Sequence, residues 1–331
     1  MVLFLAVAAA SCGTKSSSSE GQSYAEAMKI VCDGAGKDPG YFKANLTNVD
    51  VIRFFGSFGD LNPALRARRM HEAIEKAGLT SCPYFDSVAT TTPMPTVPDL
   101  GLAPLPEAPA LVITPNAIVV EGKSIVAVTN GDVDPAEKEG GATGLKIPRV
   151  TAFMKALVAA STAKAPSGPP VTLNLFVDPT TPYSLLMSTM SSAKGAPIRT
   201  FALAVHAAKA TKAIMIVLPD APTLDPASTA VRMAVAVTNK HILLWSISGQ
   251  EGSIPQPKLD VAIDRVDDVR KALAEIAERR WPGGKDHEKD ILVIADGDVP
   301  VQKIAEVMAA VRTTGDGKPL FPDVLLGSGF Q

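Results

Sequence analysis

The sequence is poor in the residue types that most often carry out catalysis or bind nucleic acid. Only 5% of its 331 residues are aromatic, and its 32 basic residues are nearly balanced by 34 acidic ones. With no basic excess or basic stripe, nucleic acid is not expected as a main partner. No Gly-x-Ser-x-Gly sequence is present, and the four histidines lie in no ligand spacing. We therefore expect a non-enzymatic protein with no cofactor and no metal.

Long apolar runs are also missing near the start of the chain. The segment MVLFLAVAAAS, residues 1–11, is too short to span a bilayer. It is typical of the apolar region and cleavage site of a secretory signal. The small residues before Cys12 resemble a lipoprotein signal, which implies lipidation of Cys12 after cleavage and a periplasmic, membrane-anchored protein. A buried N-terminal strand is the alternative, but residues 13–21 form a flexible, Ser-rich spacer that favours the signal. Gly13, where aspartate would favour inner-membrane retention, points to the outer membrane.

Cysteine is scarce, with single residues at positions 12, 32 and 82. If Cys12 carries lipid, Cys32 and Cys82 remain as a pair. Neither has a second Cys or His near it at the spacing of a zinc site. In the oxidising compartment that an export signal implies, the pair should form a disulfide. A bridge closing a loop of this length is expected to contribute about 4 kcal/mol on the chain-entropy model.

Residues 22–85 predict a small all-α unit tied by this disulfide. Ser23 and Glu26 form a capping-box pattern, which predicts that a helix begins there. Pro63 and Gly78 bracket a second helical stretch as start and stop signals. The next segment, residues 86–109, is rich in Pro and Thr and predicts a semi-rigid extended spacer.

The rest of the chain contains an internal repeat. The segment VDPTTPYSLLMSTM aligns with ADGDVPVQKIAEVM, so that Asp178 matches Asp296 and Pro182 matches Pro300. Upstream, Thr114 matches Thr238. The two units are expected at residues 110–222 and 230–331, with the longer loop of the first unit in NGDVDPAEKEGGATG.

Each unit predicts the order ββαβαβ and an α+β fold. β-Branched strand pairs come first, and then an amphipathic helix, a buried strand ending at the matched aspartate, a helix opened by the matched proline, and a last strand. The two helices are expected on one face of a small mixed sheet. The segments that carry this prediction are LVIT, AIVVEG, RVTAFMKALVAASTA, LNLFV and TFALAV in unit one, and VAVT, ILLWSI, VDDVRKALAEIAERR, ILVIA and DVLLG in unit two.

This order, with strand–Asp–x–x–x–Pro–helix at its centre, resembles the periplasmic domain of the ExbD/TolR family of biopolymer-transport proteins. DGDVP followed by VQKIAEVMAAVR is similar to the pattern of that family. The resemblance implies dimerising periplasmic modules that contact partner proteins or the cell wall. Family members also have an N-terminal transmembrane helix with an essential aspartate. No such helix precedes either unit here, so the proton-coupling role is not carried over.

The two aspartates of DGDVP have two interpretations. Asp296 is repeated as Asp178, whereas Asp298 is replaced by Thr180. Because only one carboxylate of the pair is repeated, we expect Asp178 and Asp296 to shape turns before helices. A metal-binding or catalytic role is the alternative. The acidic stretch from Asn130 has Pro135 where a calcium-binding EF-hand loop needs glycine, so we interpret it as a solvated loop.

The sequence favours a lipid-anchored module that binds or scaffolds cell-envelope proteins or peptidoglycan. The first alternative is a component of a proton-driven transport complex, whose transmembrane helix would have to come from an upstream start codon. The second is an enzyme of unknown type. The twelve residues 219–230 span at most about 40 Å, and this tether raises the effective concentration of the two units. We expect an intramolecular pseudo-dimer.

Overall fold

The computed structural model divides the chain into two compact units, Met1–Thr92 and Pro93–Gln331. The fold of each unit is considered separately, over the part of the chain that the structure describes. That part comprises residues 21–34, 37, 39–56, 63–80, 82, 94–121, 123–164, 171–196, 198–208, 210–219, 230–284 and 288–327.

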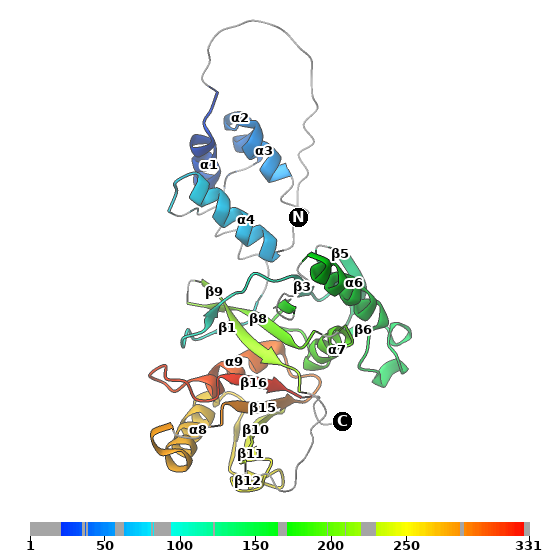
Figure 1. Ribbon diagram of the computed structural model, residues 1–331, viewed down its shortest axis with the longest axis vertical. Helices are drawn as coiled ribbons and strands as arrows, with labels where there is room; N and C mark the ends of the chain where they lie inside the picture. The colour runs from blue at the N-terminus through cyan, green and yellow to red at the C-terminus, as the bar shows by residue number, and fades with distance from the viewer. Residues whose placement is uncertain are drawn as a thin grey trace, which may run out of the picture. The chain divides into compact units, whose positions relative to one another are not determined.

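The first unit is helical. Its helices are α1 (Tyr24–Asp33), α2 (Pro39–Asn45), α3 (Val49–Gly56) and α4 (Pro63–Lys76) (Figure 1). Helix α1 begins at Ser23, whose hydroxyl accepts from the Glu26 backbone N–H while the Glu26 carboxylate accepts from the Ser23 N–H, which completes the expected capping box. Met28, Val31 and Val51 are among the residues that form its small core.

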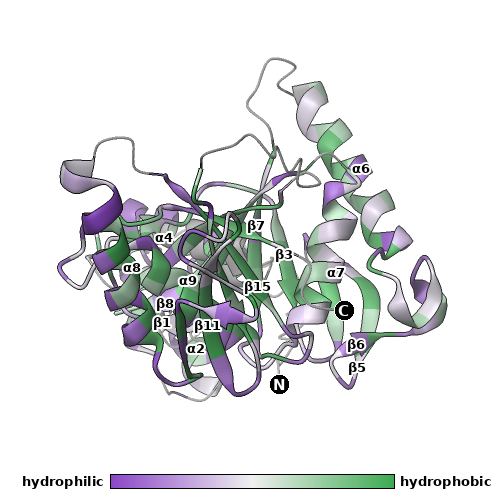
Figure 2. Cartoon of the chain, turned by 90° about the horizontal axis from the view of Figure 1, so that it is seen from below, coloured by the Kyte–Doolittle hydropathy of each residue, from purple (hydrophilic) through white to green (hydrophobic). Residues whose placement is uncertain are grey.

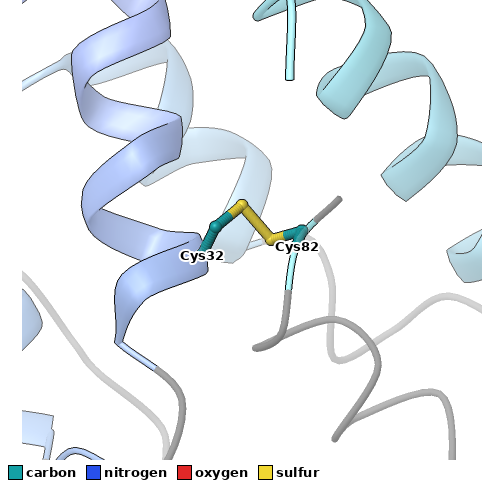
Figure 3. The surroundings of a disulfide bond; sticks show 2 residues. All are labelled: Cys32 and Cys82. Carbon is teal, nitrogen blue, oxygen red and sulfur yellow. A yellow bond between two sulfur atoms is a disulfide. The ribbon is translucent and has the colours of Figure 1, made fainter. Parts of the chain in front are cut away.

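The disulfide between Cys32 and Cys82 is present (Figure 3). Cys32 lies in the last turn of α1, and Cys82 follows α4 by a few residues. Both side chains are buried in the core of the unit. The bridge therefore joins the first helix of the unit to the segment after the last described helix, and it closes a loop that includes most of the unit.

The second unit is a mixed α+β structure built on one large sheet. The strand order along the sheet is β14-β11-β10-β15-β16-β9-β8-β7-β3-β4-β5-β6. Apolar residues run along central strands such as β3, β7 and β15 (Figure 2). In the first half of the unit the strands are β3 (Ala110–Ile113), β4 (Ala117–Val120), β5 (Lys123–Thr129), β6 (Asp132–Val133), β7 (Thr172–Val177), β8 (Thr200–Ala207) and β9 (Ala210–Val217). In the second half they are β10 (Met233–Val237), β11 (His241–Ser246), β14 (Leu259–Ala262), β15 (Asp290–Ala295) and β16 (Asp323–Leu326).

Four helices pack against one face of this sheet. They are α6 (Pro148–Lys164), α7 (Tyr183–Lys194), α8 (Val266–Arg280) and α9 (Val301–Arg312). Helix α7 contacts α6 on one side and α9 on the other, and α9 contacts α8, so the helices form one row. Alternate strand residues such as Leu175 and Val293 point into the core beneath them. Short elements complete the unit: η2 (Pro135–Glu137), η3 (Gly141–Thr143), η4 (Pro282–Gly284) and the hairpin β12 (Gly252–Ser253) with β13 (Gln256–Pro257).

The order of elements differs from the expected ββαβαβ by one strand in each half. Strand β5 precedes helix α6, and strand β14 precedes helix α8, each pairing with the second strand of its half. Both halves therefore follow the order βββαβαβ, apart from β6, the hairpin and the extra strand β9. The third strand of the second half has no strong apolar signal, because β14 alternates partly buried and exposed residues at an edge of the sheet.

The spacer expected at residues 86–109 is only partly a spacer. Its described part, from Met94 onward, belongs to the second unit. Strand β1 (Thr96–Val97) pairs with β8, and strand β2 (Ala103–Pro104) pairs with β9. Met94, Val97 and Leu102 are buried. The physical reason is that β8 and β9 extend past their neighbours in the sheet, so their free backbone groups are paired by this segment.

Candidate functional site: the paired aspartate–proline loops

The repeated motif forms two loops that meet within the second unit. The first, residues 178–182, joins β7 to α7, and the second, residues 296–300, joins β15 to α9. Pro182 and Pro300 form an isolated antiparallel bridge with each other. We call these segments the paired loops.

Each loop begins with the same backbone turn. The N–H of Asp178 donates to the Ile113 carbonyl, and the N–H of Asp296 donates to the Val237 carbonyl, both at 2.9 Å. Each aspartate carbonyl then accepts from the backbone N–H three residues later. The Asp178 carboxylate also accepts from the Thr180 N–H at 2.8 Å and from its hydroxyl at 2.5 Å. These bonds fix the direction in which the chain leaves the strand.

The hairpins before the loops are also equivalent. The Thr114 hydroxyl accepts from the Ala117 N–H at 3.0 Å, and the Thr238 hydroxyl accepts from the His241 N–H at 2.8 Å. Both hydroxyls lie 3.1 Å from the carbonyl of the same partner residue and donate to it. The matched threonines thus close the same tight turn between the first two strands of each half.

Across the two halves, the loops exchange backbone hydrogen bonds reciprocally. The Tyr183 N–H donates to the Val299 carbonyl at 2.9 Å. Its repeat-equivalent, the Val301 N–H, donates to the Thr181 carbonyl, also at 2.9 Å. Because each bond is the counterpart of the other under the repeat alignment, the two loops are related by an approximate two-fold axis.

A second reciprocal pair extends this arrangement. The Ser184 N–H donates to the Gly297 carbonyl at 2.8 Å, and the Gln302 N–H donates to the Pro179 carbonyl at 2.9 Å. The four donors are the first two backbone N–H groups of α7 and of α9, which have no partner within their own helices. The matched prolines hold φ at −64° with extended ψ in both copies, and their missing N–H removes a further unpaired donor. Each loop therefore caps the helix of the other half.

Sheet pairing shows the same symmetry. Strand β9 is antiparallel to β8 and parallel to β16, so β8 and β16 run in opposite directions on either side of it.

The Tyr183 hydroxyl in the first half also donates to the Gly327 carbonyl in the second. Burial raises the pKa of this phenol above its ordinary value. Sequence reasoning did not identify Tyr183 or β9, because no local pattern marks a contact between distant segments.

The second carboxylate of DGDVP has a different environment from its counterpart. Asp298 accepts from the Asn239 side-chain amide at 2.6 Å, whereas Thr180 bonds to Asp178. Across the described residues, no group of three or more His, Cys, Asp or Glu side chains is placed to hold a metal ion. The Asp178 carboxylate thus accepts hydrogen bonds within its own turn, and the Asp298 carboxylate pairs with a neighbouring side chain.

The acidic stretch from Asn130 is also internally bonded. The Lys138 ammonium is buried and lies 2.6 Å from the Asp132 carboxylate. The Asp134 carboxylate accepts from the Ala136 N–H at the start of η2. Two of its acids are therefore used within the loop.

Two expectations about the N-terminus concern residues outside the described part of the chain. They are the lipidation site Cys12, with its signal, and most of the spacer 13–21. Among the helices that are described, none is both long and apolar enough to cross a membrane.

Comparison of the chain with known protein families, curated proteins and solved structures gives no match. The arguments for function therefore rest on the residues and contacts given above.

Proposed function

We propose that the protein is an exported, non-enzymatic lipoprotein that acts as a binding or scaffolding module in the bacterial cell envelope. Residues 110–222 and 230–331 form two ExbD/TolR-like halves derived from a ββαβαβ plan, and they act as one intramolecular pseudo-dimer. Residues 22–85 form a disulfide-tied helical unit, and Cys12 carries the lipid anchor, with the outer membrane favoured. The partners are envelope proteins or peptidoglycan.

The reciprocal bonding of the paired loops is the observation that carries this proposal. The repeated motif is the feature most similar to the ExbD/TolR pattern, and here its helix N-termini donate to the opposite loop. A motif whose polar backbone groups serve to join two halves is a structural device rather than a reaction centre. The bonding between the paired loops favours a rigid unit with two related halves, as expected for a protein that binds partners and holds them in place.

The disulfide supports export. A buried Cys32–Cys82 bridge in the first unit is stable in the periplasm and rare in the cytosol, where thiols are kept reduced. This agrees with the apolar, small-residue N-terminus and with a lipid anchor.

Fractionation of cells tests the proposal directly. The full-length protein should partition with the envelope, and Cys12→Ser should be released into the soluble periplasmic fraction. In-cell cross-linking should then give adducts with envelope proteins or peptidoglycan fragments. A wild-type protein found in the cytosol with reduced cysteines would refute the proposal.

A further inference from the structure

The connection between the second and third strands differs in length between the two halves of the second unit. In the first half, β4 ends at Val120 and β5 begins at Lys123, so two residues join them. In the second half, β11 ends at Ser246 and β14 begins at Leu259, so twelve residues join the equivalent strands. Residues 247–258 contain the short hairpin formed by β12 and β13 (Figure 1). We call these twelve residues the anchored hairpin.

A buried carboxylate fastens the anchored hairpin to the last turn of α8. The Glu251 side chain is only 4% exposed. The Arg279 guanidinium lies 2.6 Å from one of its oxygens, the Arg280 guanidinium binds the other, and the Lys258 ammonium lies at 3.9 Å. The Glu251 N–H donates to the Ser246 hydroxyl at 2.7 Å. Because a buried carboxylate is unfavourable unless it is paired, these bonds hold the hairpin in one position.

The backbone of the anchored hairpin is fixed as well. Gly252 has a φ of +81°, and a Cβ atom there would lie 2.5 Å from the Lys258 nitrogen and 2.8 Å from the Gln256 carbonyl oxygen. Only glycine fits such a position. The Arg280 guanidinium donates to the Gln250 side chain at 2.8 Å and to its carbonyl at 3.1 Å. A hairpin with a defined shape loses little conformational entropy when it binds a partner.

The tip of the anchored hairpin is exposed and carries no charge. Residues 253–256 have the sequence Ser-Ile-Pro-Gln, and all four are exposed. Across the described residues, four large apolar side chains are exposed, and two of them lie in this hairpin: Ile254 at 50% and Ile247 at 41%. Single exposed apolar residues are common. Two on one short, fixed hairpin provide apolar area that a partner can remove from water.

The charged side chains exposed beside this tip are basic. Lys258 is 44% exposed, Arg279 is 55% exposed and Arg280 is 28% exposed. With Glu251, three cations and one carboxylate give a net charge of +2. Ile254 is three residues from Glu251, which is at most about 11 Å along the chain. The apolar tip and the cations are therefore close enough to contact one surface.

Acids that are near in the sequence do not neutralise these cations. The Asp260 carboxylate lies 2.7 Å from the His241 ring nitrogen Nδ1. Glu278 points about 100° away from its neighbour Arg279 around α8. Within the described part of the chain, neither carboxylate lies at ion-pair distance from Lys258, Arg279 or Arg280.

An apolar tip beside cations matches the surface of an anionic bilayer. Such a surface accepts an apolar side chain at the boundary of the lipid tails and places phosphates at the level of flanking Lys and Arg side chains. A soluble polyanion would attract the cations but leave Ile254 in water. An acidic protein segment is the competing partner. The bilayer is favoured over it because the proposed lipid anchor already holds the chain at a membrane, where a weak second contact is occupied.

We propose that the anchored hairpin docks on an anionic lipid bilayer, with Ile254 entering the interface and Lys258 and Arg279 binding lipid phosphates. This inference deepens the proposed function and rests on it, because the lipid anchor brings the hairpin to the membrane. The contact is weak without the anchor, so Cys12→Ser is still released on cell fractionation. With the anchor, the contact fixes how the second unit faces the membrane.

Vesicle sedimentation tests the inference on residues 13–331, which lack the signal and the lipid and retain every described element. The probes are vesicles of phosphatidylcholine with and without about one-third phosphatidylglycerol, up to millimolar lipid, at an ionic strength where the Debye length is about 8 Å. The wild type should bind the anionic vesicles at least about tenfold more tightly than the neutral ones.

Replacement of the tip residue tests the apolar part of the contact. Ile254→Ser should weaken binding to the anionic vesicles about fivefold, because it removes the side chain that enters the interface. Ile254 is half exposed, so the variant should fold normally. Val49→Ser is the matched control, because Val49 is 64% exposed and lies in the first unit. The control should bind as the wild type does.

Replacement of one cation tests the electrostatic part. Lys258→Gln should weaken binding to the anionic vesicles about fivefold, and Glu251 keeps both of its arginines in that variant. Lys271→Gln is the matched control, because Lys271 is 75% exposed and lies 3.9 Å from the Asp268 carboxylate, as Lys258 does from Glu251. Lys271 is about 12 Å along α8 from the arginines, so its removal should change binding much less.

Absence of binding to the anionic vesicles would overturn the inference, as would equal binding by Ile254→Ser and Val49→Ser. Binding that Lys258→Gln and Lys271→Gln weaken equally would place the contact elsewhere and also overturn it. Full release by millimolar glycerol phosphate would show that the cations bind a free phosphate and not a bilayer. Each of these results would leave the lipid anchor, and so the proposed function, to be judged by cell fractionation.

Discussion

Replacing Tyr183 by phenylalanine should weaken the contact between the two halves of the second unit. The substitution keeps the buried ring and removes only the hydroxyl that donates to the Gly327 carbonyl. A neutral hydrogen bond contributes about 0.5–1.5 kcal/mol net, and the loss is larger when the partner stays desolvated. Gly327 is half-buried, so water can replace part of the bond. We expect a loss of about 1 kcal/mol in the free energy of unfolding, or about 2–4 °C in Tm for a unit of this size.

The pH dependence of this difference is a sharper test. Burial raises the pKa of Tyr183 in the folded state above the ordinary value of 10.0. A raised pKa means that the folded state binds the proton more tightly than the unfolded state. The stabilisation is therefore complete below the unfolded pKa and is lost as pH rises above it. The wild type should lose stability above about pH 10, and Tyr183→Phe should lose less.

Urea denaturation followed by tryptophan fluorescence at several pH values measures both effects. Both tryptophans, Trp245 and Trp281, lie in the second unit, so the signal reports on the unit that contains Tyr183. Ile254→Val is the control in the same unit, because Ile254 is 50% exposed. It should change stability by less than about 0.5 kcal/mol and lose stability in alkali as the wild type does. Equal stability of the wild type and Tyr183→Phe at neutral pH, with parallel loss in alkali, would show that the Tyr183–Gly327 bond does not contribute to stability.

Other predictions concern the anchor, the bridge, the turn and the assembly. A palmitate analogue should label the wild type and leave Cys12→Ser unlabelled; equal labelling would exclude lipidation there. Reduction of the Cys32–Cys82 bridge should add two hydrogens to the intact mass and destabilise the first unit by up to about 4 kcal/mol; an unchanged mass would argue against the bond. Asp178→Ala should lower the free energy of unfolding by about 1 kcal/mol, whereas Asp178→Asn should lower it much less, because asparagine can accept the same hydrogen bonds. Equal losses in the two variants would assign another role to the carboxylate. Light scattering of the signal-free chain should give a monomeric mass, and a stable dimer would contradict an intramolecular pseudo-dimer.

Features set by local sequence were the easiest to predict. The helix start at Ser23 follows from a capping box that lies within four residues. The disulfide followed from a cysteine count and an expected compartment. The strand–Asp–x–x–x–Pro–helix order was visible because aspartate and proline act on their own backbone.

Features set by distant segments were not predictable in the same way. Strand β9 pairs with β8 through a short connection but also with β16 from the other half, and the sequence of β9 does not indicate its second partner. The bonds between the paired loops join backbone groups, which every residue has, so no pattern of residue types in the sequence predicts them. Strand β14 lies at an end of the sheet, where alternating partly buried and exposed residues weaken the apolar signal. Strand β5 does contain three buried apolar residues, and the sequence prediction overlooked it.

The chemistry of the paired loops explains which residues the two repeats share. The four bonds across the two-fold axis use only N–H and carbonyl groups, so they require a backbone path and not particular side chains. Asp178 and Asp296 begin that path, and Pro182 and Pro300 end it with the same φ and ψ. Positions between them are free to differ, as Thr180 and Asp298 do. A joint made of backbone bonds therefore lets the side chains of the two halves diverge while the path of the backbone is kept.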